Sequence, residues 1–343
     1  MPRDLSLLKT ALPVWAAPMA GGPSTPALVR AAARAGGLGF LAGGYKSPLA
    51  LADQIIEVHD SGAAFGVNLF APNPLPITAD NYRTYARALQ KEADRYDLTL
   101  PDELPAEDDD AFSKKIDLLL TAPVPLVSFT FGLPDPDTVR ALQDTNTLVA
   151  QTITTPTEAL AAANTGVDLL IVQAPAAGGH SATLTPDRPL TPISLPDLVS
   201  DVRHATNLPV IATGGITTAA DTAAALKAGA HAAMIGTALL RTHESGASPA
   251  HKAALADPSF TTTVITRAFT GRPARALRNH FTDHYEPTAP LGYPALHHLT
   301  SALRKAATTA NDTRLIHLWA GTGYRHARIE PATQTLTRLA TDL

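Results

Sequence analysis

The chain contains 343 residues, enough for one large α/β domain with insertions or for two domains of medium size. Hydrophobic residues make up 45% and charged residues 17%, a balance that suits a large buried sheet and argues against a disordered chain. The net charge of −4 includes no basic run, so nucleic acid is not an expected partner. Cysteine is absent, which excludes disulfides, iron–sulfur clusters and a thiol nucleophile.

The N-terminal region does not resemble an export signal or a membrane helix. Residues 1–4 carry no basic stretch that leads into an apolar core. The longest uncharged stretch, residues 10–29, is interrupted by four prolines, which a membrane-spanning helix would not tolerate. We therefore expect a cytoplasmic protein that does not associate with a membrane.

Short apolar runs alternate with amphipathic stretches as far as residue 236. Eight of these runs are too short for helices and are bounded by glycine, proline or polar residues, as β-strands are. The predicted strands are Val14–Met19, Leu38–Ala42, Phe65–Phe70, Leu126–Phe131, Leu148–Thr152, Asp168–Gln173, Pro209–Thr213 and Ala232–Gly236. Eight strand–helix repeats in a chain of this length predict a closed (β/α)8 barrel, the TIM barrel, with an open doubly wound sheet as the alternative.

Helix starts and ends support this repeat. Four helices are expected to begin with a capping side chain followed by proline, which loses no hydrogen bond at the first helical position. These pairs are Thr25-Pro26, Ser47-Pro48, Asp135-Pro136 and Thr155-Pro156. Thr155 and Glu158 also have the spacing of a capping box. Gly36 and Gly229 stand where helices are expected to end in a left-handed turn.

Two segments are too long for the barrel repeat. The third and fourth strands are joined by residues 77–122, with helical stretches at 82–96 and 112–120. The acidic run between these stretches, Glu107-Asp108-Asp109-Asp110, is expected to be a solvated loop rather than a metal site. The second segment, residues 255–312, should form helices that cover the mouth of the barrel. The barrel itself would comprise residues 1–76 and 123–254, with residues 313–343 returning to it.

The sixth predicted strand ends at Gln173, and the short segment Ala174–Ala177 connects it to Gly178-Gly179-His180. In parallel α/β folds the carboxyl ends of strands open into a shared cavity, and glycine lets the backbone approach a ligand there. An imidazole titrates near neutral pH and can accept or donate a proton. His180 is therefore the candidate catalytic residue, although a histidine in an ordinary surface loop would give the same pattern.

Glycine turns also follow the seventh and eighth strands, at Gly214-Gly215 and Gly236-Thr237. In TIM barrels these two loops often bind phosphate through backbone amides. The competing interpretation is that the glycines only shape tight turns. A P-loop and a Rossmann fingerprint are both absent, which argues against an ATP site and a dinucleotide domain.

Taken together, these residues resemble the nitronate monooxygenase family, formerly 2-nitropropane dioxygenases, and more closely its histidine-containing class I. The likeness covers nearly the whole chain. It is carried by Ala17-Pro18-Met19, residues 65–70 (FGVNLF), residues 127–132 (VSFTFG), Ala177-Gly178-Gly179-His180, residues 212–216 (ATGGI), Tyr293-Pro294, residues 297–300 (HHLT) and residues 318–323 (LWAGTG).

The resemblance implies a TIM barrel with an added helical region that binds FMN and oxidises alkyl nitronates, or nitroalkanes, with O2 to a carbonyl compound and nitrite. It implies a small-molecule substrate, no metal, and a monomer or homodimer. His180 would be the catalytic histidine, and Tyr293 and His297 would line the substrate pocket. The residues expected to hold FMN are Met19, Asn68, Gln173, Gly178, Gly215, Met234, Ile235, Gly236 and Thr237.

The chain departs from the family pattern beside His180. Where relatives read Gly-x-Glu-Ala-Gly-Gly-His-x-Gly, this chain has Ala176 in place of the glutamate and Ala182 in place of the last glycine. Thr322 replaces a glutamine that many relatives have. Two other functions therefore stay open: an NAD(P)H-dependent FMN reductase of an enoyl thioester or quinone, and a barrel that binds FMN or phosphate without turnover.

Other aromatic and histidine residues are assigned simpler roles. Trp319 is expected to pack the barrel mouth rather than stack on the cofactor. His297 and His298 are adjacent on a predicted helix, so at most one of them should face the pocket. Four further histidines have no partner pattern and are expected at the surface or in packing: His204, His231, His243 and His251.

Overall fold

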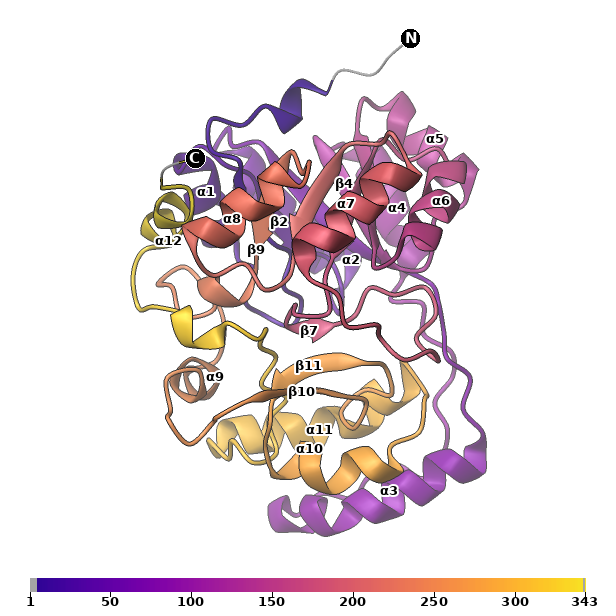
Figure 1. Cartoon of the computed structure of the whole chain (residues 1–343). Helices are drawn as coiled ribbons and strands as arrows, with labels where there is room; N and C mark the ends of the chain where they lie inside the picture. The colour runs from indigo at the N-terminus through magenta and orange to yellow at the C-terminus, as the bar shows by residue number, and fades with distance from the viewer. Residues whose placement is uncertain (1–4, 342) are drawn as a thin grey trace.

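The computed structural model describes residues 5–341 and 343, and in it eight parallel strands close into a barrel. The barrel order is β1 (Val14–Ala16), β2 (Gly39–Ala42), β3 (Phe65–Ala71), β4 (Leu126–Phe131), β5 (Leu148–Ile153), β6 (Leu169–Gln173), β8 (Val210–Thr213) and β9 (Ala232–Ile235) (Figure 1). All eight predicted strands are present, and the predicted (β/α)8 barrel is confirmed. β1 is shorter than expected and ends before Pro18, which has no N–H for a sheet hydrogen bond.

Side chains fill the interior of the barrel. Trp15, Phe40, Leu126, Ile171 and Met234 belong to one buried cluster contributed by strands on all sides. Alternate residues of the same strands face outward into a larger core under the helices. The barrel is therefore a packed core, and its ligand space lies at the ends of the strands.

Helices cover the outside of the barrel. They are α1 (Pro26–Arg34), α2 (Pro48–His59), α4 (Phe112–Thr121), α5 (Pro136–Asp144), α6 (Pro156–Asn164), α7 (Leu195–Ala205), α8 (Ala219–Lys227) and α12 (Ala332–Leu339). α12 comes from the C-terminal segment and packs against α1 and β1. Short 3-10 turns occur at Ser6–Leu8, Asp94–Tyr96, Thr237–Leu239, Glu286–Thr288 and Tyr324–His326. None of the helices in the described part of the chain is both long and apolar enough to cross a bilayer.

The predicted helix caps are confirmed. Thr25, Ser47, Asp135 and Thr155 each accept a hydrogen bond from a backbone N–H in the first turn of the helix that follows. Gly36 and Gly229 have φ of +87° and +107° and end their helices as expected.

The capping box predicted at Thr155 and Glu158 is wrong. The Glu158 carboxylate accepts from the N–H of Thr154, at 2.6 Å, rather than from that of Thr155. Its other oxygen accepts from the Thr183 hydroxyl and the Leu184 N–H, at 2.8 and 2.7 Å. Glu158 therefore ties down the loop that follows His180, a role that spacing within one helix does not reveal.

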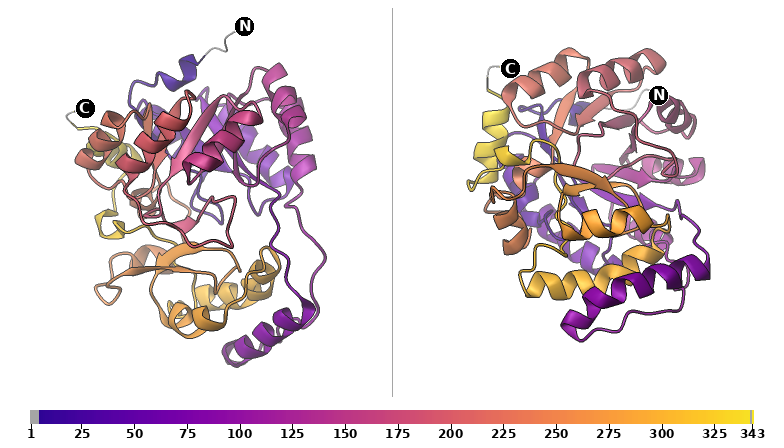
Figure 2. Two further views of the ribbon diagram at one scale, coloured as in Figure 1. Left: turned by 45° about the vertical axis from the view of Figure 1, so that its right-hand side comes forward. Right: turned by 60° about the horizontal axis from the view of Figure 1, so that its bottom comes forward.

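A second, smaller core forms the cap, which lies over one end of the barrel (Figure 1). Its elements are α3 (Ala79–Ala93), α9 (Pro249–Ala254), β10 (Thr263–Thr266), β11 (Ala274–Leu277), α10 (His280–Tyr285) and α11 (Ala295–Thr309). Figure 2 shows α3 beside α11, and the two helices are in contact. The segment 255–312 was expected to be helical only, and the hairpin β10–β11 corrects that expectation.

The connection between β3 and β4 divides between the two cores. α3 contributes Tyr82, Tyr85 and Leu89 to the core of the cap, and the Tyr85 hydroxyl donates to the carbonyl of Ala268. α4 contributes Ile116 and packs on the barrel, where it is the ordinary helix between β3 and β4. Only the part before α4 is an addition to the barrel.

The acidic run in this connection is exposed at three positions and partly buried at the fourth. Asp110 accepts from the N–H of Tyr45 at 2.9 Å, and its other oxygen lies 2.7 Å from Nζ of Lys115, which is 1% exposed. Asp108 pairs with His298 of the cap at 2.9 Å. The expected solvated loop is thus correct for Glu107 to Asp109 and wrong for Asp110.

The two-residue strand β7 (Gly179–His180) joins barrel and cap. It pairs antiparallel with β11, with His180 opposite Ala274, and completes a three-stranded sheet in the order β10-β11-β7. The sequence predicted a loop here. The strand exists because β11, far away in the sequence, supplies its hydrogen-bonding partner.

Candidate active site

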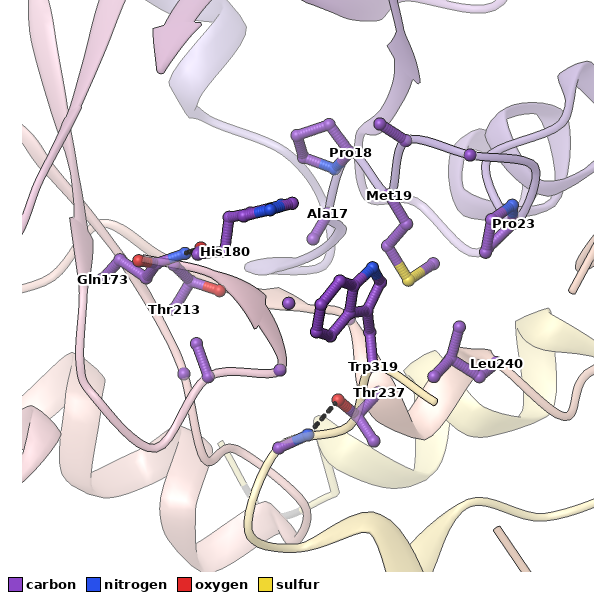
Figure 3. A pocket seen from close by; sticks show the side chains of 18 of the residues that line it. Ala17, Pro18, Met19, Pro23, Gln173, His180, Thr213, Thr237, Leu240 and Trp319 are labelled. Carbon is purple, nitrogen blue, oxygen red and sulfur yellow. Dashed lines mark hydrogen bonds between the residues drawn. The ribbon is translucent and has the colours of Figure 1, made fainter. Parts of the chain in front are cut away.

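A cavity of about 310 Å³ lies between the carboxyl ends of the barrel strands and the cap. Figure 3 shows part of its lining, in which the His180 imidazole and the Trp319 indole point into the same space. Most of its walls come from the loops after β1, β6, β8 and β9, and the cap adds the segment from Ile316 to Gly323. Ligands of TIM barrels bind at this end of the strands.

His180 is held in place from three directions. Its backbone pairs with β11, and its Nε2 lies 2.9 Å from the hydroxyl of Thr270. Gln173, at the end of β6, donates to the carbonyl of His180 and accepts from the N–H of Ala182. No hydrogen bond joins Nδ1 of His180 to any described residue. This nitrogen is therefore the one available to a ligand.

Aromatic rings surround His180. Its ring centroid lies 5.2 Å from that of Trp319 and 5.7 Å from those of Phe131 and Tyr293. Phe131 has a φ of +84°, which is strained for a bulky side chain, and Asn73 fixes it by donating to its carbonyl at 2.9 Å. Strain of this kind is commonly kept at functional sites.

Two buried arginines stand behind these rings. The guanidinium of Arg272 lies 4.1 Å from the centroid of the Phe131 ring, and that of Arg304 contacts His297 and His317. Arg272 is 0% and Arg304 6% exposed, and neither forms an ion pair with a carboxylate among the described residues. Buried charges are normally paired, so the cavity is a place where a negative charge would be stabilised.

The histidine stays neutral in this environment. Burial, together with the smaller effect of the charges of Arg272 and Arg304, lowers the pKa of His180 to about 3. Burial also lowers the pKa values of both guanidinium groups, to about 10, so both remain charged near neutral pH. At neutral pH the site therefore combines an uncharged imidazole with two positive charges.

The two glycine turns after β8 and β9 form another wall. Gly214 and Gly215 have φ of +105° and +81°, a region that favours glycine. Gly236 is different: its φ is −108°, and a Cβ there would meet no protein atom closer than 3.9 Å. The protein itself does not require glycine at this position, so the open space beside it fits a ligand. The hydroxyl of Thr237 accepts from the N–H of Gly321 at 2.9 Å, and its own proton remains free to donate.

Asn68 presents an acceptor to the same cavity. Its amide nitrogen donates to Ser128 and to the hydroxyl of Thr130, at 2.9 and 3.0 Å for the side-chain contacts. Its amide oxygen has no hydrogen bond to the described residues. Asn68 therefore suits a ligand that carries an N–H group.

Most predicted site residues come together in the cavity. Its lining includes Met19, Asn68, Gln173, Gly178, His180, Gly215, Met234, Gly236 and Thr237. Ile235 is not part of the lining, because strand alternation turns its side chain outward into the core under the helices. Tyr293 and His297 lie just behind the lining: Tyr293 contacts the His180 ring, and His297 stacks on Tyr45 at 4.2 Å.

Some residues of the site were not predicted. His251 was expected at the surface or in packing; it is buried, lines the cavity and bonds the carbonyl of Trp319 at 3.0 Å. Tyr45 and His317 also line the cavity and were not predicted, and Trp319, which is expected at the barrel mouth, lines it too. His204, His231 and His243 are exposed, as expected. No cluster of three or more His, Asp or Glu side chains that could bind a metal occurs within residues 5–341.

Comparison with known proteins shows which family the chain belongs to. The family model for nitronate monooxygenase matches residues 3–342. The chain belongs to the nitronate monooxygenase family. It is 32% identical to a probable nitronate monooxygenase of Staphylococcus aureus strain MRSA252, over 98% of this chain and 96% of that protein. The relative in strain Newman is 33% identical with the same coverage.

Solved structures agree with this assignment to the nitronate monooxygenase family. The nitroalkane oxidase of Streptomyces ansochromogenes is 45% identical and superposes with a TM-score of 0.92, over 97% of this chain and 96% of that one. FabK of Thermotoga maritima is more distant, at 25% identity and a TM-score of 0.74, over 97% and 93% of the two chains. The protein is a flavin-dependent oxidoreductase of the nitronate monooxygenase type, built on a TIM barrel.

Proposed function

We propose that the protein uses FMN to oxidise alkyl nitronates with O2, which yields a carbonyl compound and nitrite. The observation that carries this proposal is the combination of a neutral His180 with two buried guanidinium groups that form no direct ion pair, beside one cavity. A nitronate is an anion whose charge lies on its two oxygens, so it fits a site beside two buried positive charges. The family and the neighbouring nitroalkane oxidase support the same chemistry.

FMN fits the residues on the phosphate side of the cavity. Gly215, Gly236 and Thr237 would hold its phosphate, and the open space at Gly236 supports this assignment. Asn68, in the middle of β3, and Gln173, at the end of β6, would bind the polar edge of the flavin ring, because each presents an amide group to the cavity. Met19, Gly178 and Met234 complete the expected contacts, together with the backbone of Ile235. Bound FMN supplies the acceptor for the electrons that leave the substrate.

His180 would bind and orient the substrate rather than act as a strong base. Its lowered pKa makes it a weak proton acceptor. A nitronate has already lost its α-proton, so this weakness does not impede its oxidation. The single proton of the Thr270 hydroxyl can go to the carbonyl of Arg272, at 3.3 Å, or to Nε2 of His180. In the first case Nε2 carries the imidazole proton and Nδ1 presents a lone pair to the substrate; in the second Nδ1 presents the proton. This favours the nitronate over the neutral nitroalkane as the better substrate.

The test is the absorbance spectrum of the purified protein, followed by anaerobic addition of propionate 3-nitronate. We expect a yellow protein whose flavin bleaches with the nitronate and recovers its colour when air is admitted. Rapid bleaching by NADH or NADPH, without bleaching by the nitronate, would instead indicate the reductase. A yellow protein inert to nitronates, nicotinamides and quinones would indicate a binding protein without turnover.

A further inference from the structure

Arg304 is a buried cation whose hydrogen bonds go only to uncharged groups. From the middle of α11, its Nε donates to the hydroxyl of Thr300 at 3.0 Å. One terminal nitrogen donates to the carbonyl of His297 at 2.9 Å and lies 3.3 Å from Nδ1 of the same residue. The other lies 3.3 Å from Nε2 of His317. Nothing in these contacts neutralises its charge.

These contacts determine the tautomers of both histidines. A guanidinium can only donate, so Nδ1 of His297 and Nε2 of His317 must each present a lone pair. The proton of each neutral ring is then on the other nitrogen. For His317 this is Nδ1, which is buried and has no hydrogen-bond partner in the described part of the chain. The contact with the guanidinium thus holds His317 in the tautomer whose N–H has no partner among the described residues.

Two series of ring contacts connect Arg304 with His180, one through His317 and Trp319 and the other through His297 and Tyr293. In the first, the ring centroid of His317 lies 5.3 Å from that of Trp319, which lies 5.2 Å from that of His180. In the second, the ring centroid of His297 lies 6.3 Å from that of Tyr293, which lies 5.7 Å from that of His180. Both routes are packed with aromatic rings, which screen a charge far less than water does.

We propose that Arg304 is a positioning residue of the active site, which fixes the tautomers of His297 and His317 and supplies the positive charge that holds an anionic substrate in the cavity. The choice of an anion as substrate rests on the function proposed above. The role of the guanidinium does not require turnover and can be tested by binding alone.

Several titratable groups face Arg304 and could mimic its effect. Tyr45 approaches from the loop after β2, His297 lies on α11 itself, and His317 comes from the segment after α11. Beyond them stand His180, His251, His298 and Arg272. Burial lowers the pKa of His180 to about 3 and of His251 to about 4, and it also lowers the pKa values of His297 and His317. Burial raises the pKa of Tyr45 to about 12. Between pH 6 and 9 Tyr45 and the four buried histidines His180, His251, His297 and His317 therefore stay neutral, while Arg272 and Arg304 stay charged.

The experiment compares Arg304→Met, which removes the charge, with Arg304→Lys, which keeps it. Calorimetry of the flavin-loaded enzymes measures the Kd of nitrite, an anion, and of nitroethane, which is neutral at pH 6. We expect Arg304→Met to weaken nitrite binding about tenfold, the size of a Coulombic interaction across roughly 10 Å of protein. Nitroethane should change less than about twofold, and Arg304→Lys should restore nitrite binding. Arg278→Met, at an exposed ion pair on the cap, is the matched control and should change neither Kd.

The wild-type enzyme gives a second test that does not depend on the folding of a variant. Its nitrite affinity should be constant from pH 6 to pH 9, because Arg304 keeps its charge over that range. An affinity that falls as the pH rises through 6 to 7 would assign the charge to a histidine and overturn the proposal. Equal weakening of nitrite and nitroethane in Arg304→Met would also overturn it, because that result indicates a purely structural role. Nitrite binding that behaves as expected in an enzyme unable to oxidise nitronates would refute the proposed function and leave this inference standing.

Discussion

Two glycines of the cavity wall are glycine for different reasons. A Cβ on Gly178 would lie 2.5 Å from the backbone nitrogen of Gly321, so the fold itself excludes a side chain there. A Cβ on Gly236 would meet only Ala17 and Met19, both at 3.9 Å. Glycine at position 236 therefore leaves room for a bound group. Glycine at position 178 leaves room for the backbone of the C-terminal segment.

This contrast separates ligand binding from folding. We expect Gly236→Ala to raise the Kd of FMN at least about tenfold, because its methyl group enters the space proposed for the phosphate. The thermal midpoint of the flavin-free protein should be unchanged. Gly178→Ala should lower that midpoint with or without FMN. Fluorescence titration and thermal unfolding of the flavin-free proteins measure both effects, and unchanged FMN binding in Gly236→Ala would contradict the assignment of the phosphate site.

At the scale of elements, the loop before α4 connects parts of the molecule that are distant in sequence. Asp110 supports the backbone of Tyr45 and pairs with Lys115, while Asp108 reaches His298 of α11. Tyr45 in turn stacks on His297 and lies 3.3 Å, hydroxyl to hydroxyl, from Tyr293. The loop thus fixes the barrel side of the cavity against the cap.

The ion pair of Asp110 and Lys115 should matter for stability because the lysine is almost completely buried. The substitution Asp110→Asn leaves the charge of Lys115 unpaired, and we expect the free energy of unfolding to fall by about 3 kcal/mol. Urea denaturation measures this loss. Asp109→Asn, at an exposed neighbour, should have no effect. Adding Lys115→Met to Asp110→Asn should recover part of the loss, and a double variant no more stable than Asp110→Asn would contradict the explanation.

The same scale shows which elements the sequence could predict. The barrel strands are mostly apolar runs buried on both faces, and the bounds predicted for Leu126–Phe131 match the structure to the residue. The cap strands are not of this kind: Thr263–Thr266 is partly exposed, and Ala274–Leu277 contains a half-buried arginine. β7 has only two residues and depends on its pairing with β11. A strand defined by its partner leaves no periodic signal of its own.

The residues of the active site likewise fall into those that could be predicted from the sequence and those that could not. The glycine turns and His180 could be predicted, because they follow strands that the sequence shows plainly. Asn68, in the middle of β3, was inferred from the family resemblance. Arg272 and Arg304 could not be predicted, because their importance comes from missing carboxylate partners and from contacts with rings on other segments. Burial without a counter-charge is a property of the folded molecule alone.

For the whole molecule, the buried neutral histidines imply sensitivity to acid. Burial lowers the pKa of His180 to about 3 and of His251 to about 4, and the pKa values of His297 and His317 are also lowered by burial. In the unfolded chain each would titrate near 6.5, so below that pH the unfolded state binds more protons than the folded state. The stability that these residues contribute is therefore complete above about pH 6.5 and is lost as the pH falls towards 3.

We expect the free energy of unfolding to fall between pH 6 and pH 4 by about 1.4 kcal/mol per pH unit for each histidine that stays neutral. Urea denaturation at a series of pH values measures the slope. His251→Gln should make the dependence of the unfolding free energy on pH less steep by the contribution of one histidine. His204→Gln, at an exposed position, should leave that dependence unchanged. A stability that is flat over this range would show that these histidines are protonated in the folded protein.

The central claim is that the imidazole of His180 faces the flavin and the nitronate in one cavity. It is tested most directly by the rate at which His180→Asn, loaded with FMN, oxidises propionate 3-nitronate in air. We expect turnover to fall at least about a hundredfold while the ratio of FMN to protein stays at the wild-type value. A variant that keeps both its flavin and its full rate would contradict the claim.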